Sequence, residues 1–118
     1  MHELSLAEEV IRLAGSEAIS RNAVSVSEIT LEIGNLSGID ADAFEHALLI
    51  LSENSIIDKS GIKIIRKKGT GICRSCGTEF EMECRITECP GCHSLPGEIR
   101  GGSEFRVVSL VVELEDST

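Results

Sequence analysis

The chain has 118 residues, enough for one modest domain or for a small lobe with a second module. Its net charge of −9 argues against a surface built for nucleic-acid phosphates, which requires clustered Lys and Arg. Only three Phe and no Trp or Tyr are present, so the core must be aliphatic, and a metal clip helps such a thin core to fold. The start, Met-His-Glu, is followed by no long apolar run, so we expect a cytoplasmic protein whose cysteines are reduced.

The first half of the chain shows alternating helix and strand patterns. Apolar residues at helical spacing predict a helix over about 4–21, and period-two alternation predicts a half-buried strand around 29–33. Asp40 is a suitable N-cap for a second helix, whose apolar stripe spans 44–51. A second strand is predicted from 62 to the basic residues that end at 68.

The second half contains a segment of different composition. Residues 69–102 are rich in Gly, Cys and Glu and poor in large aliphatics, which predicts a module held by metal. Residues 105–114 form an apolar strand that should return to the sheet of the first lobe. We therefore predict an α+β fold: two helices packed on a small three-stranded sheet, with an inserted zinc-ribbon-like module. The predicted domains are 1–68 plus 103–118, and 69–102.

Four cysteines form two C-x-x-C pairs, Cys73 with Cys76 and Cys89 with Cys92. Two such turns can close a tetrahedral shell of thiolates at about 2.3 Å from a zinc ion. A closed shell leaves no position for water, so this site should be structural. Disulfides are the alternative, but the spacing and the odd count, with Cys84 as the fifth cysteine, argue against them.

The N-terminus offers a second set of metal ligands. The amine of Met1, the amide nitrogen of His2 and its imidazole can close two chelate rings, and Glu3 or a water can supply a fourth donor. Three or four nitrogens in one plane suit Ni(II) or Cu(II) better than zinc. The alternative is an idle histidine on a frayed terminus.

No pattern for catalysis is present in the sequence. There is no G-x-x-x-x-G-K-[ST] loop to hold a nucleotide, and no nucleophile–histidine pair stands out. We expect that the chain is not an enzyme and that any energy input comes from a partner.

The motifs together resemble the hydrogenase-maturation nickel metallochaperones, the HypA/HybF family. The resemblance rests on the start Met-His-Glu-Leu-Ser-Leu, on the two cysteine pairs, and on the closing strand that begins Gly-Ser-Glu-Phe at 102–105. It covers nearly the whole chain in the same order. It implies delivery of nickel to the large-subunit precursor of NiFe-hydrogenase together with a GTPase of the HypB type, and in some members a role in urease maturation.

The resemblance also implies roles for single residues. His2 would be the essential nickel ligand, with the amine of Met1 and the segment through Glu3 completing the nickel site. The four paired cysteines would hold structural zinc. One departure is His93, where the family more often has Gly, so that this turn is either strained or of another type.

Cys84 is a second departure. It could replace a cysteine of the pairs or respond to redox state, or it could be a small apolar side chain in a loop.

Two other classes of protein stay open. A zinc-ribbon protein that binds nucleic acid or assists transcription is possible, although the charge and the lack of stacking aromatics count against it. A rubredoxin-like iron site is the other, and a red colour would reveal it. We expect no nucleic-acid or membrane partner, and a monomer or a weak, domain-swapped dimer.

Overall fold

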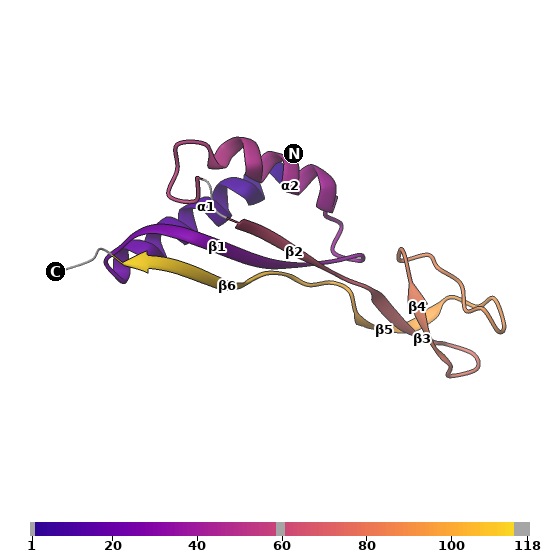
Figure 1. Ribbon diagram of the computed structural model, residues 1–118. Helices are drawn as coiled ribbons and strands as arrows, with labels where there is room; N and C mark the ends of the chain where they lie inside the picture. The colour runs from indigo at the N-terminus through magenta and orange to yellow at the C-terminus, as the bar shows by residue number, and fades with distance from the viewer. Residues whose placement is uncertain (1, 59–60, 115–118) are drawn as a thin grey trace. The chain divides into compact units, whose positions relative to one another are not determined.

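The computed structural model describes residues 2–58 and 61–114, without the side chain of His2. In this part of the chain the elements are, in order, α1 (His2–Ser20), β1 (Ala23–Gly34), α2 (Ala41–Ser52), β2 (Gly61–Lys67), β3 (Gly69–Cys73), β4 (Glu79–Met82), β5 (Pro96–Gly101) and β6 (Phe105–Leu114) (Figure 1). They form two compact units. Unit 1 contains the described residues of 1–31, 40–64 and 107–118, and unit 2 contains 32–39 and 65–106. Among the described residues, no helix is long and apolar enough to span a membrane.

Helix α1 begins at His2, two residues before the predicted start. Glu3 lies in its first turn, where a carboxylate interacts favourably with the helix dipole. The helix ends as predicted near Asn22, which has a left-handed φ of 57° and donates its N–H to the carbonyl of Ile19 at 3.1 Å. Its buried side chains are small and follow helical spacing: Ala7, Val10, Ala14 and Ala18.

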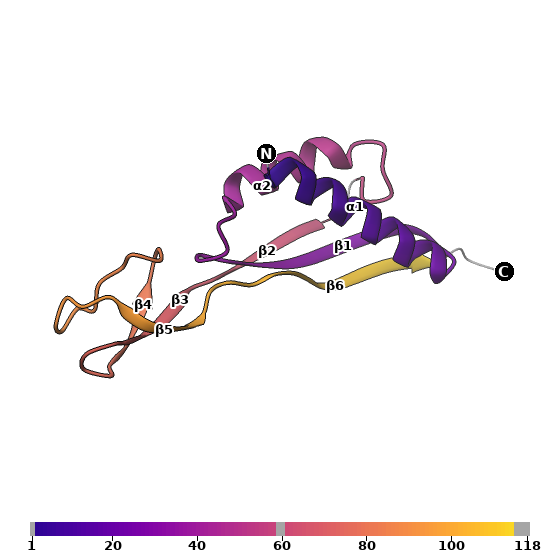
Figure 2. The same cartoon turned by 180° about the vertical axis from the view of Figure 1, so that it is seen from behind.

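Helix α2 begins at the predicted cap. Asp40 Oδ1 accepts hydrogen bonds from the N–H groups of Asp42 and Ala43 at 3.0 and 3.1 Å, which satisfies two of the unpaired donors at the helix start. Phe44 and Leu48 on its predicted apolar stripe are fully buried. Both helices lie on the same face of the first sheet (Figures 1 and 2).

The first sheet has the order β2-β1-β6. The strand predicted around 29–33 is longer than expected and starts at Ala23. The strand predicted over 105–114 is confirmed as β6, and it returns to the first sheet beside β1. Ile29 and Leu31 of β1 are fully buried. The prediction of two helices on a three-stranded sheet is confirmed.

Unit 2 contains a second sheet of order β4-β3-β5, and both pairings are antiparallel. β4 pairs with β3, with Met82 opposite Gly69. The composition did not predict β3 and β5, because Gly and Pro are depleted in strands and weaken the sequence signal. The inserted module is therefore more regular than its composition indicated.

The core of unit 2 brings together residues distant in sequence. Its buried members are Leu36, Cys73, Phe80, Met82 and Cys89, with Ile99 packed against them. Because Leu36 belongs to this core, unit 2 includes residues 32–39. It also includes residues 65–68 and 103–106, so it extends beyond the predicted module 69–102 on both sides. The functional division into a nickel-binding lobe and a zinc module stays a prediction.

Three glycines of unit 2 allow close contact between backbones. A Cβ added to Gly34 would overlap the carbonyl oxygen of Gly102, and one added to Gly69 would lie 2.6 Å from the side chain of Leu36. Backbone hydrogen bonds run from Gly34 N to Glu104 O at 2.8 Å and from Leu36 N to Gly102 O at 2.6 Å. Only glycine fits where the chain segments approach this closely.

Candidate metal centres

The four paired cysteines meet in unit 2. Their sulfur atoms all lie within 4.8 Å of one another. Cys73 ends β3 and is buried, as is Cys89, whereas Cys76 and Cys92 are exposed. The first cysteine of each pair is therefore buried in the core of unit 2, and the second is exposed to solvent.

The sulfur geometry fits a tetrathiolate metal site. A tetrahedral zinc ion with bonds of about 2.3 Å requires sulfur–sulfur distances of about 3.8 Å. The distances are 3.2 Å between Cys73 and Cys92, 3.7 Å between Cys76 and Cys89, and 3.8 Å between Cys76 and Cys92. The four sulfur atoms thus fit a structural zinc ion held by thiolates.

The two cysteine turns share one backbone pattern. In the first, Cys73 N donates to Thr78 O at 2.9 Å and Gly77 N donates to Cys73 O at 3.1 Å. In the second, Cys89 N donates to Ser94 O at 2.9 Å and His93 N donates to Cys89 O at 2.8 Å. The two turns therefore place their cysteines in equivalent positions.

Backbone N–H groups also point at the sulfur atom of Cys73. The N–H groups of Ser75 and Cys76 each donate to Cys73 Sγ at 3.4 Å. These two hydrogen bonds lower the pKa of Cys73, but the hydrogen bond with the Cys92 side chain and burial raise it overall to about 11. Metal binding at Cys73 must therefore release a proton.

His93 occupies the position that Gly77 holds in the first turn. Gly77 has a φ of 75° and His93 a φ of 63°. The sequence predicted that His93 either strains this turn or changes its type. The turn is of the same type as the first, and a side chain at positive φ is unfavourable, so the turn is strained. The His93 imidazole is exposed and lies 4.0 Å from the Glu88 carboxylate.

Two hydroxyl residues that sequence reasoning missed lie beside the exposed sulfurs. Thr78 Oγ1 is 3.2 Å from Cys76 Sγ. Hydrogen bonds from the Thr78 hydroxyl and backbone N–H lower the pKa of Cys76 to about 6. Hydrogen bonds lower the pKa of Cys92 as well: the largest effect comes from the Ser94 hydroxyl and the next largest from the Cys73 side chain. The sequence does contain a signal for these contacts: a Thr or Ser lies two positions after the second cysteine of each pair.

The remaining thiol and the remaining described histidine lie apart from this centre. Cys84 is exposed in a turn in which Thr87 N donates to Cys84 O at 3.1 Å, and it does not belong to the four-sulfur cluster. His46 is exposed on α2.

The predicted nickel site is described in part. Met1 and the side chain of His2 lie outside the described residues. The backbone of His2 and Glu3 forms the first turn of α1. Glu3 Oε2 accepts a hydrogen bond from the N–H of Asp40 at 3.2 Å. This contact, which sequence reasoning missed, ties the start of α1 to the start of α2.

Fold and site together define a small α+β protein with a four-cysteine module, and comparison with known proteins gives its family. The model of the family described as hydrogenase/urease nickel incorporation, metallochaperone, hypA matches residues 1–112. The hydrogenase maturation factor HypA of Parabacteroides distasonis is 39% identical over 117 residues, covering 98% of this chain and all of the relative. That of Francisella philomiragia is 34% identical over 111 residues, covering 94% and 98%.

Solved structures agree with the sequence relatives. The solution structure of the Ni metallochaperone HypA from Helicobacter pylori matches with a TM-score of 0.63 and 27% identity, covering 96% of this chain and 98% of that one. Another solution structure of a HypA protein matches with a TM-score of 0.65 and 27% identity, covering 98% of both chains.

The chain belongs to the HypA family of nickel-incorporation metallochaperones, which act in hydrogenase maturation. The predicted resemblance is confirmed. Membership implies partners in the maturation machinery, and metallochaperones carry ions and do not catalyse reactions.

Proposed function

We propose that this chain binds Ni(II) through the amine of Met1, the amide nitrogen and imidazole of His2, and a donor from Glu3. We further propose that it delivers the ion to the large-subunit precursor of NiFe-hydrogenase, with urease as a second candidate client. The four cysteines Cys73, Cys76, Cys89 and Cys92 would hold a structural zinc ion.

The observation that carries this proposal is the position of His2 and Glu3 in the first turn of α1. The first four N–H groups of a helix have no partner within the helix. The amide nitrogens of His2 and Glu3 can therefore become metal ligands without the loss of any helical hydrogen bond. A planar set of nitrogens is the arrangement that Ni(II) favours.

Glu3 could bind nickel through its amide nitrogen or through its carboxylate. Its contact with Asp40 favours the amide nitrogen. The carboxylate accepts the Asp40 N–H at 3.2 Å and so holds the terminal turn on the lobe. We infer that the Glu3 amide nitrogen or a water, and not the carboxylate, is the fourth nickel donor. The carboxylate then acts as a positioning group.

The two metals would have separate tasks. Four thiolates around zinc leave no open position, so that ion would stabilise unit 2. A planar nickel shell has open axial faces, so an incoming ligand can attack before the first ligands leave. Because the sequence has no nucleotide-binding loop, a GTPase of the HypB type would supply the energy for transfer.

The test is a nickel titration of zinc-loaded protein with its native, untagged N-terminus. His2→Ala should abolish tight nickel binding while leaving zinc content and melting temperature unchanged. His46→Ala is the matched control, because His46 is exposed on α2, and it should bind nickel like the wild type. A Gly-Ser extension before Met1 should weaken binding, since it replaces the primary amine with an amide. Unchanged nickel affinity in His2→Ala would falsify the proposal.

A further inference from the structure

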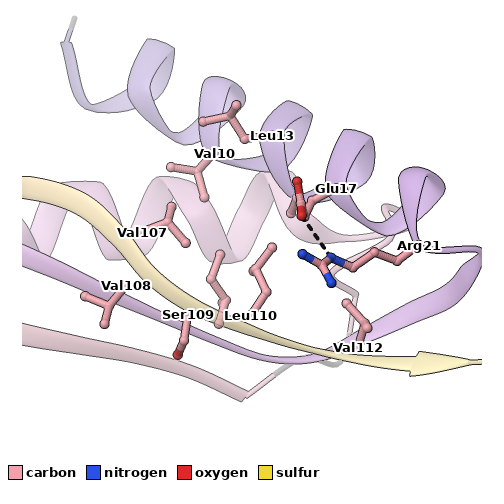
Figure 3. Close-up of a pocket in the computed structure, with 11 residues that line it drawn as sticks. Val10, Leu13, Glu17, Arg21, Val107, Val108, Ser109, Leu110 and Val112 are labelled. Carbon is pink, nitrogen blue, oxygen red and sulfur yellow. Dashed lines mark hydrogen bonds and ion pairs between the residues drawn. The ribbon is translucent and has the colours of Figure 1, made fainter.

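The two units differ in their reactive side chains. All five cysteines of the chain lie in unit 2. In unit 1, a pocket of about 570 Å³ between α1 and β6 is lined by aliphatic side chains, one serine and the ion pair of Glu17 with Arg21 (Figure 3). No cysteine or histidine is among its lining residues. Thiol chemistry is therefore confined to unit 2, whereas the proposed nickel ligands belong to unit 1.

The four clustered cysteines are not equally accessible to solvent. Cys73 and Cys89 are 3% and 0% exposed and belong to the core of unit 2. Cys76 and Cys92 are exposed. Residues 74–77 and 90–93, the turns that carry these two cysteines, are exposed as well. Because oxidation of a thiolate depends on its exposure, a small oxidant in water reaches Cys76 and Cys92 before the two buried sulfur atoms.

The two exposed sulfur atoms are also neighbours. Cys76 Sγ lies 3.8 Å from Cys92 Sγ, which is the spacing of two ligands on one tetrahedral zinc ion. A disulfide requires about 2.05 Å between its sulfur atoms. The bond can therefore form only if these sulfur atoms give up the tetrahedral spacing, so disulfide formation and zinc release are coupled.

Two other sulfur pairs are equally close, but each of them contains a buried sulfur atom. Cys73 Sγ lies 3.2 Å from Cys92 Sγ, and Cys89 Sγ lies 3.7 Å from Cys76 Sγ. Moving a buried cysteine into a disulfide disturbs a close-packed core, which is costly. The exposed turns that carry Cys76 and Cys92 can approach each other without this cost. The arrangement therefore favours a disulfide between the two exposed cysteines.

We propose that Cys76 and Cys92 form a peroxide-sensitive pair whose oxidation to a disulfide releases zinc from unit 2. This inference rests on the structural zinc ion of the proposed function. A structural zinc ion uses four ligands, and the two thiolates left, Cys73 and Cys89, do not suffice to retain it. Because zinc binding and folding are coupled, loss of the ion loosens unit 2.

The oxidant is hydrogen peroxide, and the reaction balances in two steps. The thiolate of one exposed cysteine attacks a peroxide oxygen, so that an S–O bond forms, the O–O bond breaks and hydroxide leaves. This sulfur becomes a sulfenic acid, and the peroxide is reduced by two electrons. The second exposed thiolate then attacks the sulfenic sulfur, so that the S–S bond forms and the S–O bond breaks. A second hydroxide leaves, and both hydroxides take protons from the buffer.

The test treats the full, nickel-free, zinc-loaded chain with hydrogen peroxide in the presence of a chromogenic zinc chelator. We expect one zinc ion to be released for each peroxide consumed. Alkylation in denaturant, followed by mass spectrometry, should then find Cys73 and Cys89 alkylated. Cys76 and Cys92 should be joined and become available only after reduction. Reduction and added zinc should restore the original zinc content.

Cys84→Ser is the matched control, because Cys84 is an exposed thiol outside the cluster. This variant should release zinc at the rate of the wild type. Much slower release from it would show that Cys84 is the thiol that peroxide attacks, and would overturn the proposal. A disulfide that contains Cys73, Cys84 or Cys89 would overturn it as well.

The zinc content of the reduced chain, measured first, separates this inference from the proposed function. A reduced chain that binds no zinc contradicts the proposed zinc site, and this inference with it. A zinc-loaded chain that keeps its ion in peroxide contradicts this inference alone. Zinc release together with a disulfide between Cys76 and Cys92 supports both.

Discussion

Glu3 and Asp40 are 37 positions apart in the sequence, and the Asp40 N–H donates to Glu3 Oε2 at 3.2 Å. The Asp40 side chain at the same time accepts the N–H groups of Asp42 and Ala43. One residue thus caps α2 and holds the first turn of α1. The turn that contains the predicted nickel ligands is fixed to the lobe by this contact.

Glu3→Ala should destabilise unit 1 and weaken nickel binding, because the Asp40 N–H loses its acceptor. We expect a loss of about 1 kcal/mol, typical of one hydrogen bond. Glu3→Gln retains an oxygen acceptor and should bind nickel nearly as well as the wild type. Thermal unfolding and nickel titration measure the two effects. A Glu3→Gln variant that melts normally but loses nickel would identify the carboxylate as a ligand and contradict the positioning role.

Thr78→Val should make zinc retention more sensitive to acid. Hydrogen bonds from Thr78 lower the pKa of Cys76 from 9.0 to about 6. The stability that this thiolate contributes is complete above the unfolded pKa and is lost as pH falls through about 6. Without the hydroxyl the pKa rises, so zinc release to a chromogenic chelator should begin at higher pH.

The matched control for Thr78→Val is Thr30→Val, which removes a half-buried hydroxyl from β1 in unit 1. Its zinc-release profile should coincide with that of the wild type. If both variants shift equally, the effect is general destabilisation and not loss of the contact with Cys76.

Cys73→Ser should release zinc and loosen unit 2, because Cys73 is both a member of the sulfur cluster and part of the buried core. Cys84→Ser is the control, since Cys84 is exposed and outside the cluster. We expect zinc content near zero in the first variant and near one per chain in the second. Loss of zinc from Cys84→Ser would mean that this thiol exchanges into the site.

His93→Gly should stabilise the zinc-loaded protein by about 1 kcal/mol, because glycine adopts a positive φ without steric cost. The exposed contact of His93 with Glu88, at 4.0 Å, contributes little that could be lost. His93→Ala keeps the strain and should melt like the wild type. Chemical denaturation of the three proteins, with zinc content checked, measures the differences. Equal stabilisation by Ala would show that loss of the imidazole, and not relief of strain, is responsible.

Gly34→Ala should prevent unit 2 from folding normally, because its Cβ would overlap the backbone of Gly102. Gly101→Ala is the matched control: its Cβ would lie 3.5 Å from Thr70 Oγ1, an ordinary contact. We expect poor expression or loss of zinc for the first variant and normal zinc content for the second. A well-folded Gly34→Ala protein would show that the glycine contact can adjust.

The sequence predicted the features that depend on neighbouring residues. Helical spacing located both helices, Asp40 was correctly assigned as a cap, and the apolar run over 105–114 was correctly assigned as a strand. Each of these follows from hydrogen bonds and side-chain periods that extend over a few residues. The composition of 69–102 predicted a metal-held module but not β3 or β5, because there sheet pairing overrides the low strand propensity of Gly and Pro.

By itself, the sequence determined the two cysteine pairs, the Met-His-Glu start and, through their order along the chain, the family. Only the tertiary structure decided that Leu36 belongs to the core of unit 2, that Gly34 must accommodate Gly102, and that Glu3 is held by Asp40. The physical reason is range. Spacing along the chain encodes turns, caps and ligand pairs, whereas contacts between distant residues depend on how strands and helices pack, and no local period records that packing.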